Sequence, residues 1–61
     1  MDYETFPTRN RALAFVYMMR GWTVEVVQVY LPDDDYADLD GNAWVIQCDG
    51  DKFLRRDGYV R

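Results

Sequence analysis

Among the side chains of this sequence that could do chemistry, the carboxylates are the most closely spaced. Five aspartates fall within eight residues of the stretch PDDDYADLDGN. Carboxylates at this density could ligate a hard cation such as calcium, act as general acids or bases, or present negative charge to a basic partner. The acidic residues in question are Asp33, Asp34, Asp35, Asp38 and Asp40.

Calcium binding in an EF-hand loop requires particular ligands at particular spacings. Asp38, Asp40 and Gly41 match positions 3, 5 and 6 of such a loop. In that register Tyr36 stands at position 1 and Gln47 at position 12, where an aspartate and a bidentate glutamate are needed. We therefore expect no functional metal site. The stretch is then either a solvated acidic connection or an acidic recognition surface.

Catalysis is not the expected role of these carboxylates. General acid–base catalysis needs a group whose pKa lies near the working pH, whereas aspartates crowded in a polar loop are expected to stay ionised. The chain has no histidine to activate a nucleophile and no glycine-rich phosphate loop. Its one cysteine, Cys48, shares a predicted strand face with Trp44 and Ile46, which indicates a buried and unreactive thiol. We expect no catalytic residue, no cofactor and no enzymatic activity.

The last part of the chain reverses the charge balance. Aromatic residues stand between the basic ones there, as in a small nucleic-acid-binding patch, but a chain of net charge −4 would bind duplex weakly at physiological salt. Direct binding to nucleic acid is therefore not expected, and exposed charge that discourages edge-to-edge strand pairing is the alternative. The basic residues are Lys52, Arg55, Arg56 and Arg61, with Phe53 and Tyr59 among them.

Length and composition predict a single domain, residues 1–61. One cysteine without any histidine excludes both an intramolecular disulfide and a zinc site. A chain of this length buries only about 60% of the surface that its unfolded form exposes, so a dense apolar core or an oligomer must supply stability. Hydrophobic residues make up 49% of the chain and aromatic residues 16%, which argues against disorder.

Residues 12–19 form the longest apolar run, and they are too few to cross a bilayer. A single free cysteine suits a reducing compartment. We therefore expect a soluble cytoplasmic protein without a membrane partner.

The stretch from Arg9 to Arg20 predicts a helix of good helix formers without an internal breaker. Thr5 or Thr8 can serve as its N-cap, and Gly21 can take the left-handed C-cap conformation. Because no charge interrupts residues 12–19, this helix has more apolar surface than one sheet covers. We predict a partner or dimer face there, made of Phe15, Tyr17, Met18, Met19 and Trp22.

Three strands are predicted to follow the helix: residues 22–30 (WTVEVVQVY), 43–48 (AWVIQC) and 51–56 (DKFLRR). Pro32 ends the first strand, Asp49-Gly50 favours a two-residue type I′ turn, and Asp57-Gly58 predicts a further turn. The α-β-β-β order of elements predicts an α+β fold, in which the N-terminal helix packs across a three-stranded antiparallel meander.

In size, acidity and lack of catalytic groups the chain is similar to the small inhibitors that phages and mobile elements use against host defence enzymes, such as anti-CRISPR and anti-restriction proteins. The resemblance is one of composition and involves no motif. It implies a binding protein that blocks or modulates a larger protein, with the acidic stretch imitating nucleic-acid charge in a basic groove. The alternative is a small structural subunit that forms a homodimer through its apolar helix.

Overall fold

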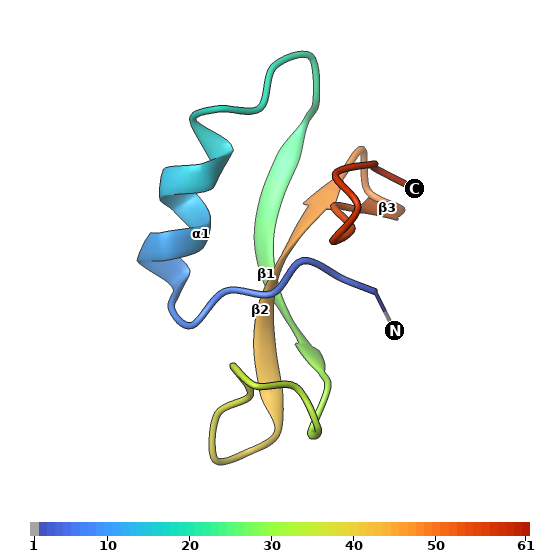
Figure 1. Ribbon diagram of the computed structural model, residues 1–61. Coiled ribbons are helices and arrows are strands. Elements are labelled where there is room, and N and C mark those ends of the chain that lie inside the picture. The colour runs from blue at the N-terminus through green and yellow to red at the C-terminus, as the bar shows by residue number, and fades with distance from the viewer. Residues whose placement is uncertain (1) are drawn as a thin grey trace.

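The structure, a computed structural model, describes residues 2–61 (Figure 1). One helix precedes three strands that form an antiparallel sheet in the order β1-β2-β3. The helix packs against β1 and β2. The predicted α+β fold is confirmed. Its elements are α1 (Arg9–Val16), β1 (Val24–Tyr30), β2 (Asn42–Cys48) and β3 (Lys52–Phe53).

Helix α1 begins where the sequence predicts and ends earlier. The Thr8 hydroxyl accepts a hydrogen bond from the Arg11 amide at 3.1 Å, which makes Thr8 the N-cap. The helix ends at Val16 rather than Arg20, because the hydrogen bonds that follow span three residues instead of four. The Met18 amide, for example, donates to the Phe15 carbonyl at 2.9 Å. This tighter turn starts the reversal that brings the chain to β1, so Gly21 (φ 85°) lies in the connection rather than at a helix C-cap.

The strands also differ from their predicted lengths. Strand β1 begins at Val24 rather than at Trp22, and β2 begins one residue early. Asp49 (φ 54°) and Gly50 (φ 83°) both have the positive φ of a type I′ turn. Pairing resumes only at Lys52, opposite Cys48, so the turn contains three residues rather than the predicted two.

Strand β3 is short because the N-terminal segment, defined as residues 2–6, takes its place beside β2 after Leu54, whose amide still donates to the Ile46 carbonyl at 3.0 Å. Leu54 pairs with Val60 across the predicted Asp57-Gly58 turn, and the N-terminal segment runs alongside as well. The Glu4 amide donates to the Leu54 carbonyl, and the Phe6 amide donates to the Trp44 carbonyl, each at 3.0 Å. Residues 3–6 are thus part of the sheet layer.

The core lies between α1 and the sheet. Its buried members come from the N-terminal segment, α1, β2 and the residue after β3, and β2 supplies the most because it is the central strand. Strand β1, in contrast, contains no fully buried residue. Within residues 2–61 no helix is long and apolar enough to cross a membrane. The core cluster consists of Phe6, Ala12, Ile46, Cys48 and Leu54.

The molecule is elongated, with extents of 33 × 22 × 19 Å. The connection from α1 to β1 lies at one end of the β1–β2 hairpin, and the connection from β1 to β2 lies at the other (Figure 1). Because the two connections are so far apart, they form separate surfaces.

Candidate functional site

The acidic loop, defined as residues 31–41, connects β1 to β2 and contains all five aspartates of the predicted partner-binding stretch. A hydrogen bond from the Leu31 amide to the Gly41 carbonyl, 2.8 Å long, closes its base. Gly41 has φ 83°, and a Cβ atom at that position would lie 2.8 Å from Cε1 of Tyr30. Glycine is needed here because the backbone is left-handed and passes against a ring.

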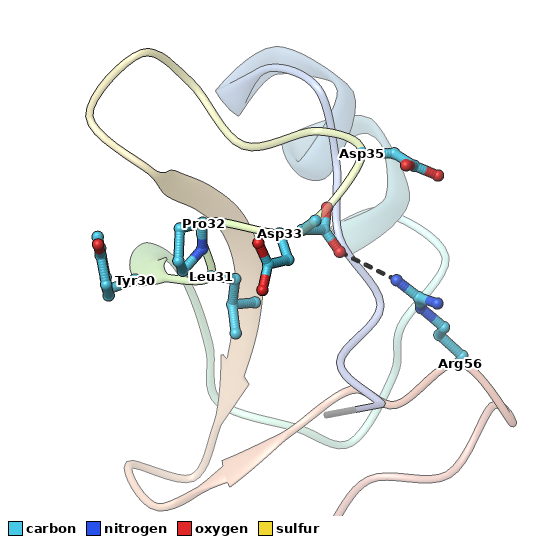
Figure 2. A pocket seen from close by; sticks show the side chains of 7 residues that line it. Tyr30, Leu31, Pro32, Asp33, Asp35 and Arg56 are labelled. Carbon is cyan, nitrogen blue, oxygen red and sulfur yellow. Dashed lines mark hydrogen bonds and ion pairs between the residues drawn. The ribbon is translucent and has the colours of Figure 1, made fainter.

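One carboxylate of the loop is held by an arginine from the far end of the chain. Arg56 Nη2 lies 3.0 Å from Asp34 Oδ1, and the dashed line in Figure 2 marks this contact. The Asp34 side chain is only 7% exposed, and its other oxygen accepts a hydrogen bond from the Tyr36 amide at 2.9 Å. Asp34 therefore serves to hold the loop in place.

A second carboxylate, Asp38, caps the return of the loop toward β2. Its Oδ1 accepts hydrogen bonds from the amides of Asn42 (3.0 Å) and Asp40 (2.9 Å), and its Oδ2 accepts one from Gln28 Nε2 (3.3 Å). These bonds, led by that from the Asn42 amide, lower the pKa of Asp38 below its usual value. Asp38 is therefore also structural.

The remaining carboxylates of the loop have no such role. Asp33, Asp35 and Asp40 are exposed, and their side chains make no hydrogen bond or ion pair with any other residue in the range 2–61. Two aspartates of the loop thus fix its shape, and the side chains of the other three make no bond within residues 2–61.

Exposed apolar side chains stand next to these free carboxylates. Tyr30 is 70% exposed and Leu39 is fully exposed, while Tyr36 is half exposed. An open groove of about 480 Å³ runs between the loop and the C-terminal arm, defined as residues 54–61 (Figure 2). Its lining residues are Tyr30, Leu31, Pro32, Asp33, Asp34, Asp35 and Arg56. Exposed aromatic rings are typical interface anchors.

The aromatic and aliphatic part of this surface and the role of Arg56 were not predicted from the sequence. Tyr36 and Leu39 could have been noticed, because large apolar residues are unexpected within a run of aspartates. The contact with Arg56 has no signal in the sequence, since 22 residues separate it from Asp34.

The basic residues of the C-terminal arm are engaged within the molecule. Arg55 and Arg61 both contact Asp2, at 3.0 Å and 2.9 Å, and Arg61 also contacts Asp57 at 2.8 Å. Hydrogen bonds from the Tyr59 amide and from Arg61 lower the pKa of Asp57. Arg55 lies 4.5 Å above the Tyr3 ring. These contacts satisfy the arm's charges, so it does not form a free cationic patch.

The residues predicted to form a partner or dimer face do not share one surface in the structure. Phe15 and Met19 are partly buried against the core. Tyr17, Met18 and Trp22 are 86%, 70% and 40% exposed, and lie in or beside the connection from α1 to β1. The predicted face is therefore reduced to a small patch at the end opposite the acidic loop.

The structure brings together few groups that could do chemistry. Among the described residues no three or more histidine, cysteine, aspartate or glutamate side chains are placed to hold a metal ion. Cys48 is fully buried as predicted, and desolvation together with the nearby Asp49 charge raises the pKa of its thiol. What the site can do is present negative charge and aromatic surface.

Comparison of the chain with protein-family models, with curated proteins and with solved structures gives no match.

Proposed function

We propose that this protein is a small non-enzymatic binding protein that blocks or modulates a larger protein, and that it binds a basic, nucleic-acid-holding groove through the acidic loop. The observation that carries this proposal is that some aspartates of the loop are bonded within the chain and the others are not. Asp34 and Asp38 hold the loop, so that Asp33, Asp35 and Asp40 project free charge from an ordered backbone. Less conformational entropy is lost on binding when the loop is already ordered.

The charge distribution supports a basic partner. The free carboxylates lie at one end, and the arginines of the C-terminal arm are paired with carboxylates of this chain. A protein groove lined by arginine and lysine would therefore meet uncompensated negative charge, which speeds association through long-range attraction. Tyr36 and Leu39 would then supply the apolar contacts that slow dissociation.

An inhibitory role follows from competition. A ligand that occupies a groove built for phosphates excludes the nucleic acid from it. In size and acidity the chain is similar to anti-CRISPR and anti-restriction proteins. This likeness favours, as the partner, a defence enzyme of the cell that a phage or mobile element enters.

The proposal is tested by recovering the partner and then changing only the free carboxylates. The protein is used as bait in a lysate of its native host, and recovered proteins are identified by mass spectrometry. Binding of the purified partner is then measured with the variant Asp33→Asn, Asp35→Asn, Asp40→Asn. We expect a slower association rate and a weaker dependence of that rate on salt.

The matched control removes the same charge elsewhere, with the substitutions Glu25→Gln, Asp49→Asn and Asp51→Asn. It should bind at nearly the wild-type rate. An oligonucleotide should compete with the protein for the partner. If the loop variant and the control associate equally fast at low salt, the acidic loop is only a solvated connection and the proposal is wrong.

A further inference from the structure

We propose that the outer edge of β1 is a pairing surface for a second copy of this chain, and that the two copies join antiparallel about Val27 to continue the sheet across a two-fold axis. This assigns dimerisation to a strand edge rather than to helix α1. The hydrogen-bonding groups of this surface belong to β1 rather than to the acidic loop.

The direction of the backbone groups along β1 follows from hydrogen bonds at its two ends. The Asp49 amide donates to the Thr23 carbonyl, and the Leu31 amide donates to the Gly41 carbonyl, each at 2.8 Å. In an antiparallel ladder, hydrogen-bonded pairs alternate with non-hydrogen-bonded ones. The odd-numbered residues of β1 therefore bond to β2. The outward-facing amides and carbonyls belong to Val24, Val26, Gln28 and Tyr30.

Nothing in the described chain covers this outer edge. Within residues 2–61 no backbone or side-chain group bonds to those outward amides and carbonyls. The sheet order places β1 at the border, and its lack of fully buried residues agrees with an open edge. The opposite border is different, because the N-terminal segment and the C-terminal arm lie beside β2 and β3.

Natural proteins protect open edges with lysine, proline, bulges or very short strands. The segment VEVVQVY has none of the first two, is seven residues long, and carries one charge, Glu25. Its pairing with β2 is continuous from Val24 to Tyr30, so it has no bulge. An unprotected edge of this length is a template for another strand.

The sequence of β1 favours one two-fold register. When Val27 lies opposite the second copy's Val27, Val24 pairs with Tyr30 and Val26 pairs with Gln28, so every outward-facing residue has a partner. Moving the axis to Val26 or Gln28 leaves outward groups of β1 without a partner inside the strand. The Val27 register also places Glu25 opposite Val29 rather than opposite the other Glu25, which avoids like charges.

The same axis joins complementary ends of the two molecules. The α1–β1 connection and the acidic loop lie at opposite ends of β1 (Figure 1). Because paired antiparallel strands run in opposite directions, the axis brings the α1–β1 connection of one copy beside the acidic loop of the other. Arg20, exposed and without an ion-pair partner in residues 2–61, then approaches the free carboxylates of the second copy's loop. Exposed Trp22 falls in register with the second copy's exposed Pro32. Opposite charge and apolar contact thus meet at both ends of the paired strands.

The first test measures mass and amide protection on the whole chain. Sedimentation should give twice the chain mass of 7.3 kDa in the micromolar range. Hydrogen exchange of the Val24, Val26, Gln28 and Tyr30 amides should slow as concentration rises, while the amides of Glu25, Val27 and Val29 should be protected at every concentration. A folded monomer throughout, with fast exchange of the outward amides, would overturn the proposal.

The second test removes a single outward donor. Gln28→Pro deletes the outward amide, and Gln28→Ala is its matched control, since both lose the bond to Asp38 and only proline loses the amide. We expect the dimer dissociation constant of the proline variant to be roughly tenfold higher than that of the alanine variant. Equal dissociation constants would place the dimer contact elsewhere, for example at Tyr17, Met18 and Trp22.

The third test checks the register with charge and does not depend on proline. Val27→Lys places two lysines opposite each other and should weaken the dimer, whereas Val29→Lys places lysine opposite Glu25 and should tighten it by about 2- to 10-fold. Circular dichroism confirms that each variant is folded. Equal effects of the two lysines would show that the Val27 register is wrong.

Discussion

Arg56 holds the acidic loop to the C-terminal arm through a 3.0 Å contact between its Nη2 and Asp34 Oδ1. The Arg56 Nε also donates to the Tyr3 carbonyl at 3.1 Å, so a single side chain connects the loop, the arm and the N-terminal segment. The loop's shape therefore depends on a residue far away in the sequence.

A double-mutant cycle measures this contact. Arg56→Ala, Asp34→Asn and the double variant are unfolded with urea, and the coupling free energy is expected to be about 1 kcal/mol, because the Asp34 carboxylate is largely buried while Arg56 is half exposed. The matched control is Lys52→Ala with Asp51→Asn, an exposed pair whose coupling should be near zero. Equal coupling for both pairs would mean that Arg56 does not hold the loop.

Replacing Asp38 by Asn should make the free energy of unfolding of the protein less dependent on pH. The pKa of Asp38 is lowered in the folded protein, so its charge stabilises the fold above the unfolded pKa near 3.9 and this contribution is lost as pH falls through the lower folded value. Thermal unfolding of wild type and Asp38→Asn should therefore differ most at neutral pH and converge in acid. A difference between the two proteins that stays the same from neutral pH into acid would contradict this role of Asp38.

Gly41→Ala should destabilise the fold more than Gly21→Ala. Both glycines have positive φ, so alanine at either position costs about 1–2 kcal/mol in backbone strain. Only at Gly41 would the added Cβ also contact a ring, at 2.8 Å from Tyr30, while nothing lies within 4 Å at Gly21. Urea unfolding gives the difference, and a shift of the Tyr30 ring resonances should accompany Gly41→Ala. Equal losses would show that the ring moves away freely.

Tyr17→Ala should leave the free energy of unfolding within about 0.5 kcal/mol of wild type, because Tyr17 is 86% exposed. Ile46→Ala, at a fully buried position, should cost about 2–5 kcal/mol. A large loss for Tyr17→Ala, measured below the concentration at which copies associate, would contradict the position of this ring outside the core.

The Cys48 thiol should resist modification in the folded protein. It is fully buried, and desolvation raises its pKa, so little thiolate is available to an aromatic disulfide reagent. We expect slow labelling in buffer and fast labelling in denaturant, followed by absorbance. Rapid labelling under native conditions would show that the strand opens locally.

The order of elements could be predicted from the sequence because it depends on local chemistry. Thr8 is a good N-cap, the valine-rich stretch before Pro32 is a good strand, and Asp49-Gly50 accepts the positive φ of a tight turn. These preferences act over a few neighbouring residues. They determined the α-β-β-β fold and the buried position of Cys48.

The tertiary structure decided where elements end and which aspartates are free. Helix α1 ends at Val16 because the chain must return to the sheet, and β3 is short because Phe6 of the N-terminal segment bonds to Trp44 where a longer strand would lie. The aspartates of the acidic loop are alike in sequence. Contacts made only in the folded chain distinguish the structural carboxylates from those that make no bond in residues 2–61: Arg56 reaches Asp34 across the fold, and the amides of Asn42 and Asp40 together with Gln28 hold Asp38.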